Sequence, residues 1–218
     1  MEYPIINNVP GITNRNDDAE SKLRHSTTQI DSHKSDFIIY TDGSATAGTT
    51  DGGFSAVITQ GPASDPSVID TIIGRGRPFT SSFEEEMAAL STALRWIDHN
   101  LVNSTVTICT DSKSLCDALT GCNNQVDSIR QLLTNMSSRV IIQWVPGHSN
   151  IPGNELADVA AKDATNLPPG VIQPISLSRV YKLINDTIKE PHIQHDRTRE
   201  VYKSHRNSTC RSNHHTLR

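Results

Sequence analysis

Residues Asp36–Asp42, which read DFIIYTD, decide how this 218-residue sequence folds. Their apolar side chains form a continuous run with two β-branched isoleucines, which predicts a strand buried on both faces of a sheet. Two more strand-like segments follow at residues 53–60 and 68–75, and turn-rich spacers separate the three segments. We therefore expect an antiparallel meander of three strands around this stretch.

Helical periodicity replaces the strand pattern after the meander. Between residues 82 and 99 the apolar side chains recur in steps of four and three, which marks one face of a helix capped by Ser81 or Ser82. The rest of the pattern predicts a strand at 105–110, helices at 112–119 and 126–136, a strand at 140–145 and a helix at 154–165. This order predicts an α/β domain at residues 36–165, with a five-stranded mixed sheet and helices on both faces.

The sequence on either side of this domain lacks a comparable pattern. Residues 1–35 are polar and show no sustained apolar period, so we expect a disordered or linker segment there. Residues 166–218 form a basic C-terminal extension, in which we expect one amphipathic helix at Leu177–Lys189 followed by disorder.

The net charge of −4 is distributed unevenly along the chain. Residues 36–165 hold 7 basic and 15 acidic side chains, whereas residues 166–218 hold 9 basic and 4 acidic side chains. An acidic domain cannot hold phosphate groups by bulk charge, but it can do so where metal ions neutralise its carboxylates. The basic extension has two interpretations, a solvated linker or a supplementary contact with nucleic acid.

Export and membrane insertion find no support in the sequence. No apolar run approaches the ~20 residues that a spanning helix needs, and the N-terminus lacks the features of a signal peptide. The four cysteines form no CxxC pair, which favours reduced thiols. We therefore expect an intracellular protein of the nucleus or cytoplasm that is not secreted and does not associate with membranes.

Two aspartates share one local pattern. Asp42 follows the segment Phe37–Thr41 and Asp111 follows Val106–Thr110, so each lies where a predicted buried strand ends. A single aspartate at such a place is usually a turn or cap residue. The carboxyl ends of strands are, however, where α/β sheets commonly bind ligands, and the repeated Thr-Asp pattern favours a shared functional site.

The run Glu84–Glu86 opens the predicted helix. Acidic side chains are common at this place as solvated charges, because they interact favourably with the helix dipole. Glu86, however, shares its helix face with Leu90 on the apolar side, where a carboxylate is costly unless a cation compensates it. We therefore interpret Glu86 as the functional carboxylate, and Glu84 and Glu85 as surface charges.

A loop framed by glycine and proline carries His148 and leads into the last predicted helix, which carries Asp158. Taken singly, a loop histidine is usually only solvated and a helix aspartate is usually a surface charge. Together with Asp42, Glu86 and Asp111, however, Asp158 completes a set of oxygen ligands. Such ligands suit two Mg²⁺ ions, or Mn²⁺, better than zinc, and two such ions can hydrolyse a phosphodiester. His148 would then carry a proton or help the product to leave.

Five sequence blocks, taken together, indicate a family. They are Tyr40–Ser44 (YTDGS), Glu86–Leu90 (EMAAL), Thr110–Ser112 (TDS), Val145–His148 (VPGH) and Gly153–Asp158 (GNELAD). In this order they resemble the type 1 ribonuclease H domain, and they look more like the domains of animal non-LTR retrotransposons than like the free-standing cellular enzyme. The resemblance implies a ribonuclease H-like fold with sheet order 3-2-1-4-5. It also implies hydrolysis of the RNA strand of RNA–DNA hybrids, leaving 3′-hydroxyl and 5′-phosphate ends.

The resemblance assigns roles to individual residues as well. It implies two metal ions bound by four carboxylates, with a histidine on a mobile loop beside them; these residues are Asp42, Glu86, Asp111, Asp158 and His148. We expect contacts with the hybrid at Gly43, Ser44, Ser82 and Ser112.

Relatives of this kind usually follow a reverse transcriptase in one polyprotein, and this chain is too short to hold one, so we expect a remnant or fragment. The basic protrusion that some members use to hold the hybrid is absent, since residues 119–139 contain only Arg130 and Arg139 as basic residues. The alternative function is therefore an inactive domain that binds nucleic acid or tethers a polyprotein. The sequence does not set the oligomeric state.

Overall fold

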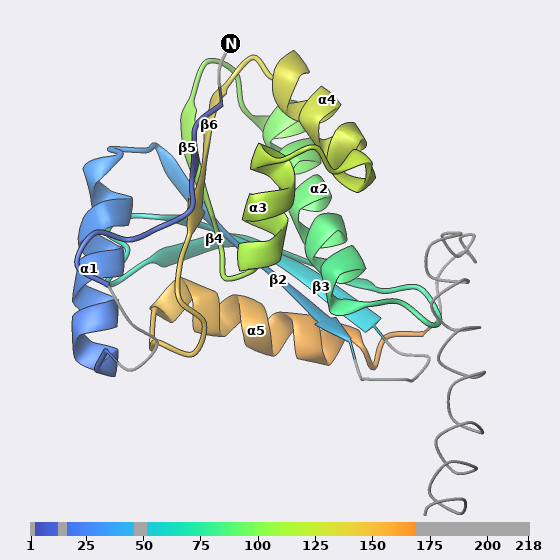
Figure 1. Ribbon diagram of the computed structural model, residues 1–218, viewed down its shortest axis with the longest axis horizontal. Coiled ribbons are helices and arrows are strands. Elements are labelled where there is room, and N and C mark those ends of the chain that lie inside the picture. Colours follow the sequence, from blue (N-terminus) through green and yellow to red (C-terminus); the bar gives the residue numbers. More distant parts are fainter. Residues whose placement is uncertain (1–2, 13–16, 46–51, 169–218) are drawn as a thin grey trace, which may run out of the picture. The chain divides into compact units, whose positions relative to one another are not determined.

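A computed structural model describes residues 3–12, 17–45 and 52–168 of the chain (Figure 1). The basic extension beyond residue 168, including the helix expected at residues 177–189, lies outside the described residues. Among the helices that the structure describes, none combines the length and the apolar character needed to cross a membrane.

A six-stranded mixed sheet forms the centre of the domain. Its strands are β1 (Ile5–Ile6), β2 (Phe37–Ala45), β3 (Gly52–Gln60), β4 (Ser67–Arg75), β5 (Thr105–Thr110) and β6 (Arg139–Trp144). They are arranged in the order β1-β6-β5-β2-β3-β4. β2, β3 and β4 form the expected antiparallel meander, and β2, β5, β6 and β1 are parallel. From β4 to β6 the predicted order 3-2-1-4-5 is confirmed, and β1 adds a sixth strand at the edge.

Helices cover both faces of the sheet, as the pattern predicts (Figure 1). On one face lie α2 (Ser82–Asn100), α3 (Lys113–Thr120) and α4 (Asp127–Asn135), the last preceded by a short 3₁₀ turn at Asn124–Val126. On the other face lie α1 (Ala19–Ser32) and α5 (Pro152–Ala164). These layers enclose two hydrophobic cores, one on each side of the sheet.

The central strand β2 contributes to both cores. Ile39 packs in the core beneath α2, whereas Ile38 and Tyr40 pack in the core beneath α1 and α5. Alternate side chains of a strand point to opposite faces, so a strand covered on both faces needs apolar residues at successive positions. This requirement explains the continuous apolar run and places β2 at the middle of the sheet.

The expectation of a disordered or linker segment before residue 36 was wrong for its described residues. β1 pairs with β6 in parallel, through Ile5↔Ile142 and Ile6↔Gln143. α1 is capped by Asp18, whose carboxylate accepts a hydrogen bond from the Ser21 backbone N–H at 2.8 Å. A two-residue strand is too short to produce a periodic pattern, and α1 buries only a narrow stripe of mixed polarity, so neither element shows a signal in the sequence.

Gly153, in the first turn of α5, lies against the ring of Tyr40. A Cβ atom at residue 153 would be 2.1 Å from Cε2 of Tyr40, and Tyr40 is fully buried. We predict that Gly153→Ala lowers the free energy of unfolding by about 1–3 kcal/mol, the usual cost of overpacking a core. Gly121→Ala, whose Cβ would meet only the Asp117 carbonyl oxygen at 3.1 Å, is the control and should cost less. Urea denaturation of both variants checks this, and equal losses would contradict the prediction.

Candidate metal centre

Asp42 and Asp111 lie side by side where the parallel part of the sheet ends. The ladder between β2 and β5 stops at the pair Thr41↔Thr110, and Asp111 directly follows β5. β2 itself continues to Ala45, because β3 goes on pairing with it. The prediction of a strand end was therefore wrong for Asp42, although the residue is the first one beyond the parallel ladder.

Glu86 reaches the same place from α2. A Cβ atom on Gly43 would be 2.3 Å from the backbone nitrogen of Glu86, so only glycine allows the helix to lie this close to β2. One carboxylate oxygen of Glu86 lies within 4.8 Å of a carboxylate oxygen of Asp42 and of Asp111, and the same limit holds between the two aspartates. The choice of Glu86 by its helix face agrees with its burial, since only 6% of it is exposed.

Burial and mutual repulsion make the three carboxylates hard to ionise. Burial, followed by repulsion from Asp111 and Asp158, raises the pKa of Asp42 to about 7. Burial, followed by repulsion from Asp42 and Asp111, also raises the pKa of Glu86 well above its ordinary value. The pKa of Asp111 is raised mainly by burial. Ionisation of all three carboxylates together would therefore need a compensating cation.

Asp111 is held by contacts from several elements. Its backbone carbonyl accepts hydrogen bonds from the Trp144 indole N–H at 3.2 Å and from the Lys113 backbone N–H at 2.9 Å. Its side chain accepts a hydrogen bond from Asn154 Nδ2 at 3.4 Å. The loop passes close by, because a Cβ atom on Gly147 would be 2.8 Å from Asp111 Oδ2. The orientation of this carboxylate is therefore fixed by β6, the loop and α5 together.

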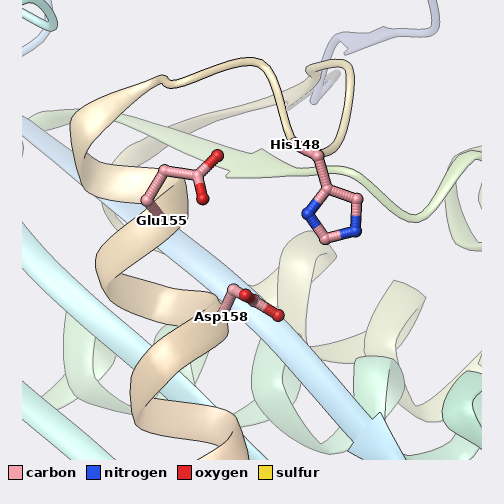
Figure 2. Close-up of side chains that lie close together, drawn as sticks. All are labelled: His148, Glu155 and Asp158. Carbon is pink, nitrogen blue, oxygen red and sulfur yellow. The ribbon is translucent and has the colours of Figure 1, made fainter.

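A second group of potential ligands lies beside the first and consists of His148, Glu155 and Asp158. Figure 2 shows His148 descending from the loop toward Asp158, while Glu155 and Asp158 project from α5. Ligand atoms of these three side chains lie within 4.8 Å of one another. Glu155 also accepts a hydrogen bond from the Asn150 backbone N–H at 3.2 Å, which ties the loop to the helix.

The structure therefore divides the four predicted carboxylates between two adjacent groups. Asp42, Glu86 and Asp111 form one group, and Asp158 belongs to the other. Asp158 still repels Asp42 and Asp111 and contributes to raising the pKa of both. It also forms an ion pair with Lys162, with Nζ 2.6 Å from Oδ2.

The residues expected to contact a substrate are close in sequence to Asp42, Glu86 or Asp111. Gly43 and Ser44 follow Asp42 in β2, Ser112 follows Asp111 at the N-cap of α3, and Ser82 is the first residue of α2. Ser82 is exposed, whereas Ser44 and Ser112 are partly buried. Their contact with a nucleic acid stays a prediction.

The expectation that Glu84 and Glu85 are both surface charges was wrong for Glu85. Only 2% of Glu85 is exposed, and burial raises its pKa in spite of hydrogen bonds from the Thr80 side chain and the Arg77 backbone. Its carboxylate fills space beside Gly52 and Gly76, where Cβ atoms would lie 2.9 Å and 2.3 Å from it. Glu84 completes a capping box with Ser81, which is the N-cap of α2.

Sequence reasoning also missed Asn154, Glu155, Lys162 and Trp144, all of which contact predicted site residues. Asn154 and Glu155 stand inside the GNELAD block next to Asp158, and this position was the available signal. Trp144 and Lys162 carry no such signal, because their contacts depend on how β6 and α5 are placed.

The donor set fits a hard divalent cation. Its atoms are carboxylate oxygens, which suit Mg²⁺ and Mn²⁺. Glu86 Oε2 and Asn154 Oδ1 are buried and have no hydrogen-bond partner in the described part of the chain. A cation bound among Asp42, Glu86 and Asp111 would satisfy Glu86 and offset the repulsion.

The raised pKa of Asp42 makes the stability of the metal-free protein depend on pH. The folded pKa, about 7, lies above the ordinary value of 3.8, so the folded state binds the proton more tightly. The free energy of unfolding therefore falls as pH rises from about 4 to about 7 and stays low above this window. We predict that Asp42→Asn, in a chelator, stabilises the protein at pH 8 but not near pH 4.

Thermal and urea unfolding at both pH values measure this effect. Asp163→Asn, at an exposed position of α5, is the control and should show no such pH dependence. Added Mg²⁺ should stabilise the wild type at pH 8 and reduce the advantage of Asp42→Asn. An advantage of equal size at both pH values would show that burial of charge is not its cause.

Comparisons with known proteins were made against solved structures, curated proteins and family models. The RNase H1 of Halobacterium salinarum NRC-1 is 22% identical, with 59% of this chain and 96% of that chain covered and a TM-score of 0.48. An N-terminal RNase H domain from Mycobacterium tuberculosis, solved as a fusion with maltose binding protein, is 17% identical, with 61% and 94% covered and a TM-score of 0.49. LC11-RNase H1, solved in complex with an RNA/DNA hybrid, is 21% identical, with 59% and 98% covered and a TM-score of 0.47.

These structural scores are too low to support an argument, and no curated protein matches the sequence. The family model for RNase H, by contrast, matches residues 34–166, which is more than half of the chain. The matched range includes β2 to β6, α2 to α5 and every predicted site residue. The chain therefore belongs to the RNase H family.

Proposed function

We propose that this protein cleaves the RNA strand of RNA–DNA hybrids endonucleolytically, using two divalent metal ions and leaving 3′-hydroxyl and 5′-phosphate ends. The observation that carries the proposal is the convergence of the buried Asp42 and Glu86 with the half-buried Asp111, since ligand atoms of the three lie within 4.8 Å of one another. Membership of the RNase H family supports the same reaction.

The four carboxylates would hold the ions, which are Mg²⁺ or Mn²⁺. When bound, two such ions activate a water molecule and stabilise the leaving oxygen of a phosphodiester. The protein would hold the metal-binding side chains in position before the substrate binds. The Gly43 backbone hydrogen-bonds the Glu86 carboxylate, and Asn154 hydrogen-bonds Asp111. Such outer contacts orient metal ligands and support their affinity.

His148 supplies a proton carrier at the edge of the site. It is exposed on a loop where it and Asn150 both have positive φ angles, of 51° and 57°. Its side chain lies with Glu155 and Asp158 in the second group. An imidazole in this place would carry a proton during the reaction or assist departure of the product.

Substrate recognition in this proposal depends on small groups rather than on bulk charge. Gly43, Ser44, Ser82 and Ser112 would contact the hybrid, and their hydroxyls and backbone groups suit 2′-hydroxyls, which distinguish RNA from DNA. We further propose that the domain acts inside the cell, in the nucleus or cytoplasm, beside a reverse transcriptase in a retrotransposon polyprotein. The five sequence blocks described above support this setting.

Cleavage of a hybrid labelled on its RNA strand tests the proposal directly. We expect cleavage that requires Mg²⁺, and we expect Asp42→Asn to lower the rate by more than ~100-fold, since loss of an outer contact alone typically costs about 10–100-fold. Asp163→Asn, on the exposed side of α5, should cleave like the wild type. Size and end-group analysis of the RNA fragments identifies the 3′-hydroxyl and 5′-phosphate.

The outcomes separate the two candidate functions. No metal-dependent cleavage by the wild type, or equal cleavage by Asp42→Asn, would reject the enzyme. Binding of the hybrid by a wild type that cannot cleave it would instead favour the inactive binding domain.

Lys162 competes with metal for Asp158. Its Nζ lies 2.6 Å from Asp158 Oδ2, and this hydrogen bond raises the pKa of Lys162. Lys162→Met removes the competing charge, so the Mg²⁺ concentration for half-maximal cleavage should fall by a few-fold. Lys162→Arg keeps the charge and should behave like the wild type. A higher Mg²⁺ requirement in Lys162→Met would show that the lysine supports the site instead.

A further inference from the structure

Residues 4–8, within the described segment 3–12, lie along the outer edge of β6 and contact Lys113, which follows Asp111 closely in the chain. β1 pairs in parallel with β6, and the Ile142 backbone N–H donates to the Pro4 carbonyl at 3.0 Å. Ile5 packs against the core that α2, α3 and α4 cover. The segment is therefore an integrated edge strand of the domain, although it precedes the range that the family model matches.

A buried amide anchors this segment to β6. Gln143 is fully buried, and its Nε2 donates to the Asn8 carbonyl at 3.1 Å. Its Oε1 lies 3.1 Å from His33 Nε2, at the end of α1. A buried amide that loses such a partner destabilises the fold, so the segment has a defined place beside β6.

Lys113 connects the segment to the Asp111 turn. Its Nζ donates to the Asn7 carbonyl at 2.7 Å and lies 3.4 Å from Asp117 Oδ1. Asn7 Nδ2 donates to the same Asp117 oxygen at 3.3 Å. The ammonium group also lies 5.8 Å from the centre of the Trp144 ring, within the range of a cation–π interaction.

Trp144 completes the connection to the metal centre. It is the last residue of β6, and its indole N–H donates to the Asp111 carbonyl at 3.2 Å. Lys113 also donates its own backbone N–H to that carbonyl, at 2.9 Å. The carbonyl therefore has two donors. One donor is the backbone N–H of Lys113, and the other is the indole N–H of Trp144, whose ring lies beneath the Lys113 ammonium group.

We propose that residues 3–12 form a brace that fixes the metal-binding position of Asp111 through Lys113 and Trp144. In this proposal Lys113 is a positioning residue, because it acts through Asp111. The inference rests on the proposed function to the extent that Asp111 is a metal ligand. The competing role for Lys113, whose side chain is 49% exposed, is a direct contact with a phosphate of the substrate.

The test compares Lys113→Met with Lys113→Arg and with Lys34→Met. Lys34 is an exposed lysine after α1, so its loss controls for net charge. Calorimetry gives the Mg²⁺ Kd of each protein, and hybrid cleavage gives kcat and KM. We expect Lys113→Met to raise the Mg²⁺ Kd by about tenfold, as outer contacts of metal ligands typically do, and to leave the KM for hybrid unchanged. Lys113→Arg should recover most of the loss.

Deleting residues 1–12 tests the brace itself. The deletion should raise the Mg²⁺ Kd at least as much as Lys113→Met, and adding Lys113→Met to it should have little further effect, because both changes break one connection. A higher KM for hybrid with an unchanged Mg²⁺ Kd in Lys113→Met would overturn the brace in favour of direct substrate contact. Wild-type values throughout would overturn it as well.

Amide hydrogen exchange separates failure of the brace from failure of the proposed function. If the wild type neither binds Mg²⁺ nor cleaves hybrid, the proposed function fails, and exchange at residues 110–114 in the metal-free protein decides the inference. Faster exchange in Lys113→Met than in Lys34→Met supports the brace. Equal exchange in the two variants overturns it.

Discussion

The close contact of α2 with β2 at Gly43 is the constraint on which the rest of the structure depends. A Cβ atom there would be 2.3 Å from the Glu86 backbone nitrogen, so helix and strand can meet at this distance only if residue 43 has no side chain. The contact brings Glu86 beside Asp42, and it also lets Leu90, one turn further along α2, enter the core with Ile39. The arrangement of the candidate metal ligands and the packing of the core therefore depend on the same close approach.

The carboxylates of the candidate metal centre destabilise the fold around them. Asp42 and Glu86 are buried near one another and near Asp111, and burial raises the pKa of all three. The hydrophobic cores on the two faces of the sheet must stabilise the fold against this repulsion. Such tension is common where function dictates the choice of residues. Lys162 relieves part of it by neutralising Asp158.

The N-terminal residues enlarge the domain on one face and at one edge. β1 covers the edge of β6, and α1 lies beside α5 on the face opposite α2 (Figure 1). Gln143 links these additions, since it contacts both Asn8 and His33. The same edge carries Trp144, which hydrogen-bonds the Asp111 carbonyl. An addition outside the family match thus contacts residues next to the candidate metal centre.

The sequence by itself determined the central strand, the helix face of Glu86 and the family. Continuous apolar runs and regular spacing are properties of neighbouring residues, so they can be recognised without knowing the tertiary contacts. Tertiary structure alone decided the burial of Glu85, because Gly52 in β3 and Gly76 just after β4 provide its space. It also decided that Asp158 joins a second group, since that depends on where α5 crosses the sheet. The sequence did not predict β1, because two residues are too few to show a periodic pattern. They form a strand only because they pair with the edge of β6.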